Sequence, residues 1–262
     1  MRTRPRPTAR PSARARSANR AGRRSRHSLA RCSYTAMVPR SIGRIIAEVE
    51  GTIEVVPDVP QAFAELLARE APQSVALSGG DTARRCYELL ATTNVDWSSV
   101  DVFFGDERWV PVDGPGSNEG MARIAFVDQV APRAVHSMRH AGDGPTAAAD
   151  AYDTLVRDSR PIDLIHLGLG SDGHTASLFP RAPSLEEADW FVVAAGDTMH
   201  PHPRVTFTFP AIARARLVVF TVAGAEKSEA FARVKRGDPV PAARVRAERI
   251  VWLVDDSAAA TA

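Results

Sequence analysis

The sequence contains few cysteines, few lysines and no long hydrophobic run. Its 262 residues include two cysteines, Cys32 and Cys86, and two lysines, Lys227 and Lys235. Two cysteines provide neither a disulfide framework nor the ligand spacing of a zinc site, and their scarcity is typical of a reducing compartment. The longest mainly apolar run, Leu217–Ala225, is about half the length that a membrane span needs. We therefore expect a cytoplasmic protein without a transmembrane segment, in which neither cysteine acts as a nucleophile.

The first 36 residues contain eleven arginines and no acidic residue. Subtracting these eleven charges from the formal net charge of +2 leaves −9 for residues 37–262, so the remainder is acidic. The low hydrophobicity of residues 1–36 predicts disorder. Three interpretations stay open, namely a targeting presequence, a basic arm for nucleic acid, or translated sequence upstream of a true start at Met37. Because lysine is almost absent from the chain, the arginines indicate a coding bias, and we expect no nucleic-acid partner.

From about residue 42 onward, short β-branched segments alternate with amphipathic segments. This alternation predicts an α/β fold in which helices flank a mainly parallel, Rossmann-like sheet. The length is ordinary for one domain, which we place at residues 37–262. The expected strands are Gly51–Val56, Ser74–Leu77, Val100–Phe104, Ile162–Leu167, Trp190–Ala194, Val205–Phe209, Leu217–Val222 and Arg249–Val254. The clearest expected helices are Pro60–Arg69, Thr82–Ala91, Asn118–Val127, Thr146–Arg157 and Glu226–Val234.

Three polar motifs follow three of the expected strands. SGGDT follows Ser74–Leu77, GDERWVP follows Val100–Phe104, and GSDGHT follows Ile162–Leu167. Ligands of open parallel sheets bind in the crevice outside the carboxyl ends of the strands. We therefore expect these three loops, distant in sequence, to converge on one pocket.

The SGGDT motif is expected at a strand-to-helix turn. There the backbone N–H groups of Ser78, Gly79, Gly80 and Thr82 could hold an anion such as phosphate. The alternative is a tight turn in which Asp81 or Thr82 caps the helix. The motif matches neither a Walker loop nor a dinucleotide fingerprint, and both interpretations stay open.

The GDERWVP motif places Asp106, Glu107 and Arg108 at the end of a core strand, where charged groups need partners. Arg108 could present its guanidinium to a phosphate or to a neighbouring carboxylate. The alternative is a solvated loop with a local ion pair. Ser117 and Asn118 are expected to cap the next helix.

The GSDGHT motif contains a candidate general base, His174. A histidine can accept a proton from water at neutral pH, and Asp172 could fix its tautomer and stabilise the imidazolium. The alternative is that His174 caps a helix beginning near Ala176. The convergence of three polar loops favours the general base.

Two further cations come from later motifs. Arg204 stands at the start of an expected strand, and Lys227 is expected in the first turn of a helix. A lysine there opposes the helix dipole, a small cost that an anionic ligand would offset. The alternatives are a charge at the sheet edge for Arg204 and a solvated side chain for Lys227.

From about Leu77 to Val254 the chain resembles the 6-phosphogluconolactonases, the cofactor-free lactone hydrolases of the pentose phosphate pathway. The segments that carry the resemblance are, in the family's order, GDERWVP, SNEGMA, GLGSDGHTASLFP and PRVTFTFPAIARARLVVFTVAGAEK. The SGGDT segment departs from the family, which more often has serine at the position of Asp81. Because a carboxylate would repel a phosphate, we expect Asp81 to point away from the site as a helix cap.

The resemblance implies a sugar-phosphate isomerase-like fold and hydrolysis of a phosphorylated δ-lactone to 6-phosphogluconate. His174 would be the general base that activates water, and Asp172 would orient it. Arg108 and Arg204 would hold the substrate. The phosphate would be bound by Gly79, Gly80, Thr82 and Lys227.

This implied chemistry requires neither a cofactor nor a metal. A δ-lactone is a reactive ester, so a positioned base contributing about 10²–10⁴-fold suffices without a covalent nucleophile. The chain has no Gly-x-Ser-x-Gly elbow, and its acids and histidines lack zinc-type spacing. We expect a monomer or a weak homo-oligomer whose partner is a small-molecule sugar-phosphate lactone.

Two other functions share a similar fold. Glucosamine-6-phosphate deaminases continue the Gly-x-Asp-Gly-His loop with Ile-Ala-Phe-Asn-Glu-Pro and have Asp-Glu-Tyr, whereas this chain has TASLFP and DERW. Sugar-phosphate-sensing domains of transcription regulators usually follow a helix-turn-helix, whereas an arginine-rich segment precedes the domain here. A sensor would bind the lactone and release it unchanged, so turnover distinguishes it from a lactonase.

Overall fold

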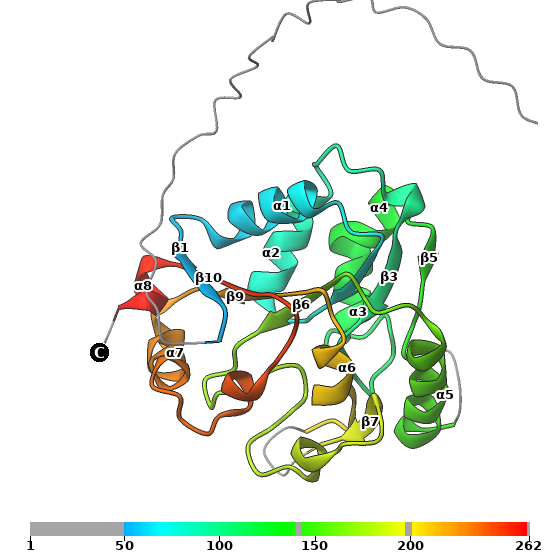
Figure 1. Cartoon of the computed structure of the whole chain (residues 1–262). Helices are drawn as coiled ribbons and strands as arrows, with labels where there is room; N and C mark the ends of the chain where they lie inside the picture. The colour runs from blue at the N-terminus through cyan, green and yellow to red at the C-terminus, as the bar shows by residue number, and fades with distance from the viewer. Residues whose placement is uncertain (1–49, 140–142, 197–200, 261–262) are drawn as a thin grey trace, which may run out of the picture. The chain divides into compact units, whose positions relative to one another are not determined.

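A seven-stranded parallel sheet organises the part of the chain that the structure, a computed structural model, describes: residues 50–139, 143–196 and 201–260 (Figure 1). The order of its strands is β1-β10-β9-β6-β2-β3-β5. The bounds are Thr52–Val55 for β1, Ser74–Leu77 for β2, Asp101–Phe104 for β3, Ala134–Val135 for β5, Leu164–Gly168 for β6, Leu217–Val222 for β9 and Ile250–Val254 for β10. The expected α/β fold with a mainly parallel sheet is confirmed. The predicted arginine-rich segment 1–36 and the predicted start of the domain at residue 37 lie outside the described residues.

The middle of this sheet is built from strands that are apolar on both faces. Every residue of β9 (LVVFTV) and of β10 (IVWLV) is buried. Continuous apolar runs of this kind are typical of parallel strands that are covered on both sides. The rings of Phe220 and Trp252 stack across β9 and β10, with their centroids 3.7 Å apart.

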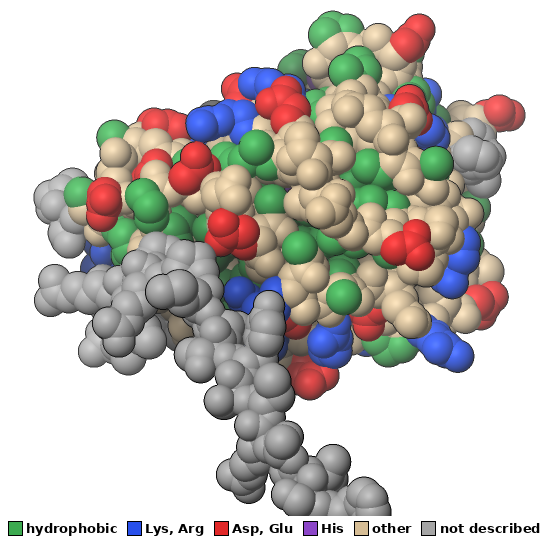
Figure 2. Space-filling view, turned by 90° about the horizontal axis from the view of Figure 1, so that it is seen from above, with side chains coloured by type: hydrophobic (Ala, Val, Ile, Leu, Met, Phe, Trp, Pro, Cys, Tyr) green, Lys and Arg blue, Asp and Glu red, His purple; other side chains and the backbone are tan. Residues whose placement is uncertain are grey.

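Helices cover both faces of the sheet (Figure 1). On one face, α1 (Val59–Glu70) and α2 (Asp81–Leu90) pack against each other and against β9. On the other face lie α6 (Phe209–Ala213) and α7 (Ser228–Lys235), while α5 (Pro145–Asp158) packs against the strands of a second sheet. The visible part of the face that carries α1 mixes acidic and basic side chains (Figure 2). No helix among the described residues has the length and apolar character needed to cross a membrane.

The second sheet is small and antiparallel, in the order β4 (Asp106–Arg108), β8 (Arg204–Phe207), β7 (Val192–Ala195). The sequence predicted β7 and β8 approximately but assigned no second sheet, and it treated the GDERWVP motif as a loop. Three consecutive polar residues show no strand periodicity, and only Gly105 separates β4 from β3. The predicted strand Val205–Phe209 also ends too late, because Phe209 begins α6.

Two predicted helices are divided in the structure. The expected helix Asn118–Val127 consists of α3 (Asn118–Ala122) and a π-helical turn (Arg123–Val127), followed by α4 (Asp128–Val130). The expected helix Glu226–Val234 consists of a 3₁₀ turn (Ala225–Lys227) followed by α7. Lys227 therefore precedes the first turn of α7 instead of lying in it. The remaining short elements are the 3₁₀ turns Trp97–Ser99, Pro183–Glu186 and Pro241–Arg244, and α8 (Asp256–Ala259).

The strand order places a crevice between β2 and β6. From β2 the chain continues outward through β3 to β5, and from β6 it continues in the opposite direction through β9 to β10. A reversal of this kind opens a crevice at the carboxyl ends of the two central strands, where ligands of doubly wound sheets bind. The SGGDT motif follows β2 and the GSDGHT motif follows β6, so both lie at this point.

Candidate active site

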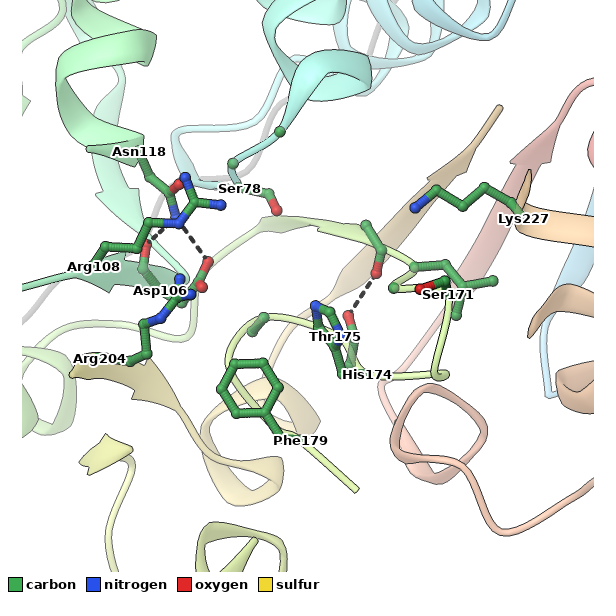
Figure 3. A pocket seen from close by; sticks show the side chains of 16 residues that line it. Ser78, Asp106, Arg108, Asn118, Ser171, His174, Thr175, Phe179, Arg204 and Lys227 are labelled. Atoms are coloured by element: carbon green, nitrogen blue, oxygen red, sulfur yellow. Dashed lines mark hydrogen bonds between the residues drawn. The ribbon is translucent and has the colours of Figure 1, made fainter. Parts of the chain in front are cut away.

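A cavity of about 310 Å³ lies at the carboxyl ends of β2, β3, β6 and β9 (Figure 3). It is lined by Ser78, Gly79, Gly80, Asp106, Arg108, Asn118, Gly168, Leu169, Gly170, Ser171, His174, Thr175, Ala176, Phe179, Arg204 and Lys227. A smaller hollow of about 190 Å³ shares Gly79, Gly80 and Lys227 with this cavity. The three polar loops therefore meet, as their positions after the strands predicted.

The structure brings together most of the residues predicted for the site. Six of the eight line the cavity, namely Gly79, Gly80, Arg108, His174, Arg204 and Lys227. Thr82 lines only the smaller hollow. Asp172 lines neither and instead contacts the ring of His174.

His174 lies in the middle of the cavity, between Lys227 on one side and Arg108 and Arg204 on the other (Figure 3). The loop after β6 brings its ring against Gly170, where a Cβ atom would stand 2.1 Å from Nδ1 of His174. Only glycine permits this approach. No helix begins near Ala176, so the alternative role of His174 as a helix cap is wrong.

Asp172 orients His174 through two contacts. Its Oδ1 accepts a hydrogen bond from the backbone N–H of His174 at 3.0 Å and lies 2.6 Å from Nδ1. Partial burial opposes ionisation of Asp172, but the hydrogen bonds from His174 outweigh it and lower the pKa of Asp172 to about 2. The carboxylate is therefore ionised at neutral pH and favours the proton on Nδ1. The lone pair of the neutral ring then lies on Nε2.

The two arginines face each other across the small sheet. The register of β4 and β8 pairs Arg108 with Arg204 and Asp106 with Thr206. Like charges directly opposite each other destabilise a sheet unless something compensates them. Both guanidinium groups line the cavity, as does the buried residue Asp106, so this end of the cavity offers hydrogen-bond donors to the oxygen atoms of a ligand.

A buried carboxylate fixes the segment that presents Arg108. Oε1 of Glu107 accepts hydrogen bonds from the backbone N–H of Arg108 (2.7 Å) and of Asn118 (2.8 Å), and Oε2 accepts from Ser117 Oγ (3.0 Å) and the Glu119 N–H (2.7 Å). Burial raises the pKa of Glu107 in spite of these four hydrogen bonds. The alternative of a solvated loop with a local ion pair is therefore wrong. The expected cap of the next helix is confirmed, since Ser117 Oγ accepts from the N–H of Gly120 at 2.9 Å.

We expect Glu107→Gln to lower the free energy of unfolding by about 2 kcal/mol, because each carboxylate oxygen accepts at least one backbone N–H. In either orientation of the glutamine amide, its NH₂ group would face a backbone N–H. Two donors would then face each other, and the backbone N–H cannot rotate away. Urea unfolding measures the effect. The matched control is Glu65→Gln on the exposed face of α1, expected within about 0.5 kcal/mol of wild type. Equal stabilities of the two variants would contradict this role of Glu107.

The turn between β2 and α2 adopts a conformation that depends on glycine. Gly80 has a φ of 97° and caps α2 without a side-chain hydrogen bond. Asp81 is the first residue of α2, and its side chain, 99% exposed, lies 3.9 Å from Arg84. Asp81 is exposed, but it also lines the smaller hollow beside Thr82, so the expectation that it points away from the site is not borne out, and its side chain does not cap the helix.

Ten of the sixteen lining residues are not among the eight predicted site residues, and six of these ten have a polar or aromatic side chain: Ser78, Asp106, Asn118, Ser171, Thr175 and Phe179. A signal existed for Asp106, since it lies two residues before Arg108 and so faces the same side of a strand. Its buried carboxylate accepts from Ser177 Oγ at 2.6 Å and from Asn118 Nδ2 at 3.2 Å. The spacing of Asp106 and Arg108 indicates a shared face only if GDERWVP is known to contain a strand. Among the described residues, no group of three or more His, Cys, Asp or Glu side chains is arranged to hold a metal ion.

The family model described as glucosamine-6-phosphate isomerases/6-phosphogluconolactonase matches residues 50–252. The chain belongs to this family. It is 40% identical to the 6-phosphogluconolactonase of Synechocystis sp. over 215 residues, which cover 76% of this chain and 89% of that relative. It is 35% identical to the 6-phosphogluconolactonase of Mycobacterium tuberculosis over 219 residues, which cover 76% and 89%.

Solved structures from the glucosamine-6-phosphate isomerase/6-phosphogluconolactonase family show the same fold. A 6-phosphogluconolactonase from Thermotoga maritima superimposes with a TM-score of 0.69 at 28% identity, covering 78% of this chain and 99% of that one. One from Shewanella baltica gives a TM-score of 0.67 at 25% identity, covering 80% and 99%. A monomeric glucosamine-6-phosphate deaminase gives a TM-score of 0.69 at 18% identity, covering 79% and 98%, and this likeness concerns the fold alone.

Proposed function

We propose that this protein is a 6-phosphogluconolactonase, which hydrolyses 6-phospho-D-glucono-1,5-lactone to 6-phospho-D-gluconate in the pentose phosphate pathway. The observation that carries the proposal is His174, in contact with Asp172, in a cavity that Arg108, Arg204 and Lys227 also line. The cavity thus combines a general base with positive charge for a phosphate. Family membership and relatives that bear this name at 35–40% identity support the proposal.

In the proposed mechanism, His174 acts on a water molecule. Nε2 accepts a proton from water while the water oxygen attacks the lactone carbonyl carbon. Asp172 stabilises the imidazolium that forms, because its carboxylate already accepts the Nδ1 hydrogen bond. The imidazolium then donates its proton to the departing ring oxygen as the bond between C1 and the ring oxygen breaks. The sum of these steps adds one water across the ester and regenerates the neutral histidine.

The cations hold the substrate so that its carbonyl meets His174. We assign the phosphate to Lys227 and the turn containing Gly79, Gly80 and Thr82, and substrate binding also to Arg108 and Arg204. Lys227, Gly79 and Gly80 are shared by the cavity and the adjoining hollow that Thr82 lines, which supports a phosphate at the boundary between the two. Asp81 and Glu226 also line the hollow, and their carboxylates favour a phosphate on the cavity side of Lys227. Orientation of this kind contributes to the rate because the carbonyl and the base no longer need to meet by diffusion.

A coupled assay tests the proposed function. Glucose-6-phosphate dehydrogenase generates the lactone in place, and 6-phosphogluconate is followed with and without this protein at a catalytic concentration. We expect the lag caused by spontaneous lactone opening to disappear. An unchanged lag with measurable lactone binding would instead indicate a sensor, and release of ammonia from glucosamine 6-phosphate would indicate a deaminase. The cytoplasmic location and the monomeric or weakly oligomeric state stay predictions.

A further inference from the structure

A chain of buried polar side chains lies beneath the turn between β2 and α2 that the proposed function assigns to the phosphate. The hydroxyl of Tyr87 is 2.7 Å from the backbone N of Ser78 and 3.2 Å from its O. The same hydroxyl is 2.9 Å from Nδ1 of His166, and Nε2 of His166 is 2.8 Å from Thr221 Oγ1. This chain joins α2, β6, β9 and the residue that follows β2, which are the elements around the crevice.

The polar atoms of this chain match one another as donors and acceptors. The Tyr87 oxygen accepts the N–H of Ser78, and its single proton has two acceptors within reach, the C=O of Ser78 and Nδ1 of His166. Both ring nitrogens of His166 contact hydroxyl groups, which can donate or accept, so either neutral tautomer is satisfied. Such a network requires a neutral histidine, and burial lowers the pKa of His166 to about 3.

Packing holds the two rings in place. Neither Tyr87 nor His166 exposes any surface. Phe63 of α1 lies against the imidazole of His166 with the centroids 4.2 Å apart, and Tyr87 meets it edge to face at 5.5 Å. Because packing leaves each ring a single rotamer, the two side chains fix the position of Ser78 relative to β6. Neither side chain lines the cavity, so any effect on substrate must pass through the backbone.

We propose that Tyr87 and His166 are positioning residues that fix the Ser78–Gly80 turn in the conformation that binds the phosphate group of the substrate. The inference rests on the proposed function, and it explains a feature that the mechanism does not use. The backbone N–H and C=O of Ser78 are both directed to a side chain at the point where β2 ends. The following residues, Gly79 and Gly80, have no side chains that could stabilise the turn, so the contacts of Ser78 with Tyr87 add to the packing of Gly79 against Asn118.

The test compares two substrates in one set of variants: the phosphorylated lactone and unphosphorylated δ-gluconolactone. For Tyr87→Phe we expect the KM for the phosphorylated lactone to rise about 5- to 20-fold, with kcat changed less than about 2-fold, because loss of one hydroxyl frees the turn. The KM for the plain lactone should stay unchanged. A variant that merely destabilises the fold would lower the activity toward both substrates alike.

Two substitutions of His166 distinguish the roles of its two ring nitrogens. His166→Asn places an amide near the position of Nδ1, which faces Tyr87, whereas His166→Gln places one near Nε2, which faces Thr221. We expect the asparagine variant to keep the wild-type KM for the phosphorylated lactone and the glutamine variant to raise it. Equal KM values for these two variants would show that the contact between His166 and Tyr87 does not position the turn.

Ser74→Ala is the matched control. Ser74 Oγ accepts from the N–H of Asp163 at 2.9 Å and so ties β2 to β6 at the end remote from the cavity. This variant should lose a similar contact and leave both KM values unchanged. If wild-type protein hydrolyses neither lactone, the proposed function fails and this inference with it. If wild type turns over the phosphorylated lactone and Tyr87→Phe keeps its KM, the positioning role alone is wrong.

Discussion

Replacing His174 with alanine is expected to lower kcat for the phosphorylated lactone by about 10²–10⁴-fold, the usual contribution of a positioned general base. The KM should change little, because the cations that bind the substrate stay in place. His174 lies between these cations, and its side chain is 27% exposed, so its loss leaves space for water instead of a collapsed core. Stopped-flow measurement with freshly generated lactone separates kcat from KM and from spontaneous opening.

The control for this substitution is His202→Ala. His202 is exposed and does not line the cavity, and its backbone carbonyl accepts a hydrogen bond from Arg204 Nε at 3.2 Å, a contact that alanine retains. Its replacement should leave kcat and KM at wild-type values. A wild-type kcat in His174→Ala, with unfolding behaviour like that of wild type, would remove His174 from the mechanism.

The second large effect is expected from the cations. Lys227→Ala and Arg204→Ala should each raise the KM for the phosphorylated lactone about 10- to 100-fold, because a hydrogen bond to a charged group contributes about 1.5–3 kcal/mol. The kcat should fall much less. Hydrolysis of unphosphorylated δ-gluconolactone should be nearly unaffected in Lys227→Ala, whereas Arg204→Ala, on the opposite side of His174, should weaken binding of both lactones. Steady-state kinetics with both lactones measure the preference for the phosphorylated one.

The chain provides its own control in its only other lysine. Lys235 lies on α7 outside the cavity, where its Nζ donates to the carbonyl of Ala259 at 3.3 Å and stands 5.3 Å from the ring centroid of Phe231. Lys235→Ala changes the net charge of the protein by the same amount as Lys227→Ala. A difference between the two variants therefore comes from the position of the lysine and not from the net charge. If Lys227→Ala retains the wild-type preference for the phosphorylated lactone, the phosphate assignment is wrong.

The parts of the site that sequence predicted are those that follow central strands. Apolar runs such as Leu217–Val222 locate buried parallel strands, and polar motifs at their carboxyl ends must then meet at one edge of the sheet. Gly79, Gly80 and His174 are predicted in this way to share one cavity, and they do. Local spacing also predicted the contact between Asp172 and His174, since the two residues share one tight loop.

The parts that sequence missed depend on contacts between distant segments. Strand β4 is polar and exists because it pairs with β8, about one hundred residues later, so neither segment alone indicates the pairing of Arg108 with Arg204. The partners of Glu107 come from the start of α3, and its role follows only once both segments are placed. His166 resembles any other residue of an apolar strand until Tyr87 is found beside it.

The most direct test of the central claim is a crystal structure of the His174→Ala protein with 6-phosphogluconate bound. The account predicts that the C1 carboxylate lies where one water molecule would bridge it to the vacated Nε2 position, within about 3 Å of each. The phosphate should then contact Lys227 and the Gly79–Gly80 turn. A carboxylate bound at the far end of the cavity, with the phosphate beside residue 174, would contradict the account.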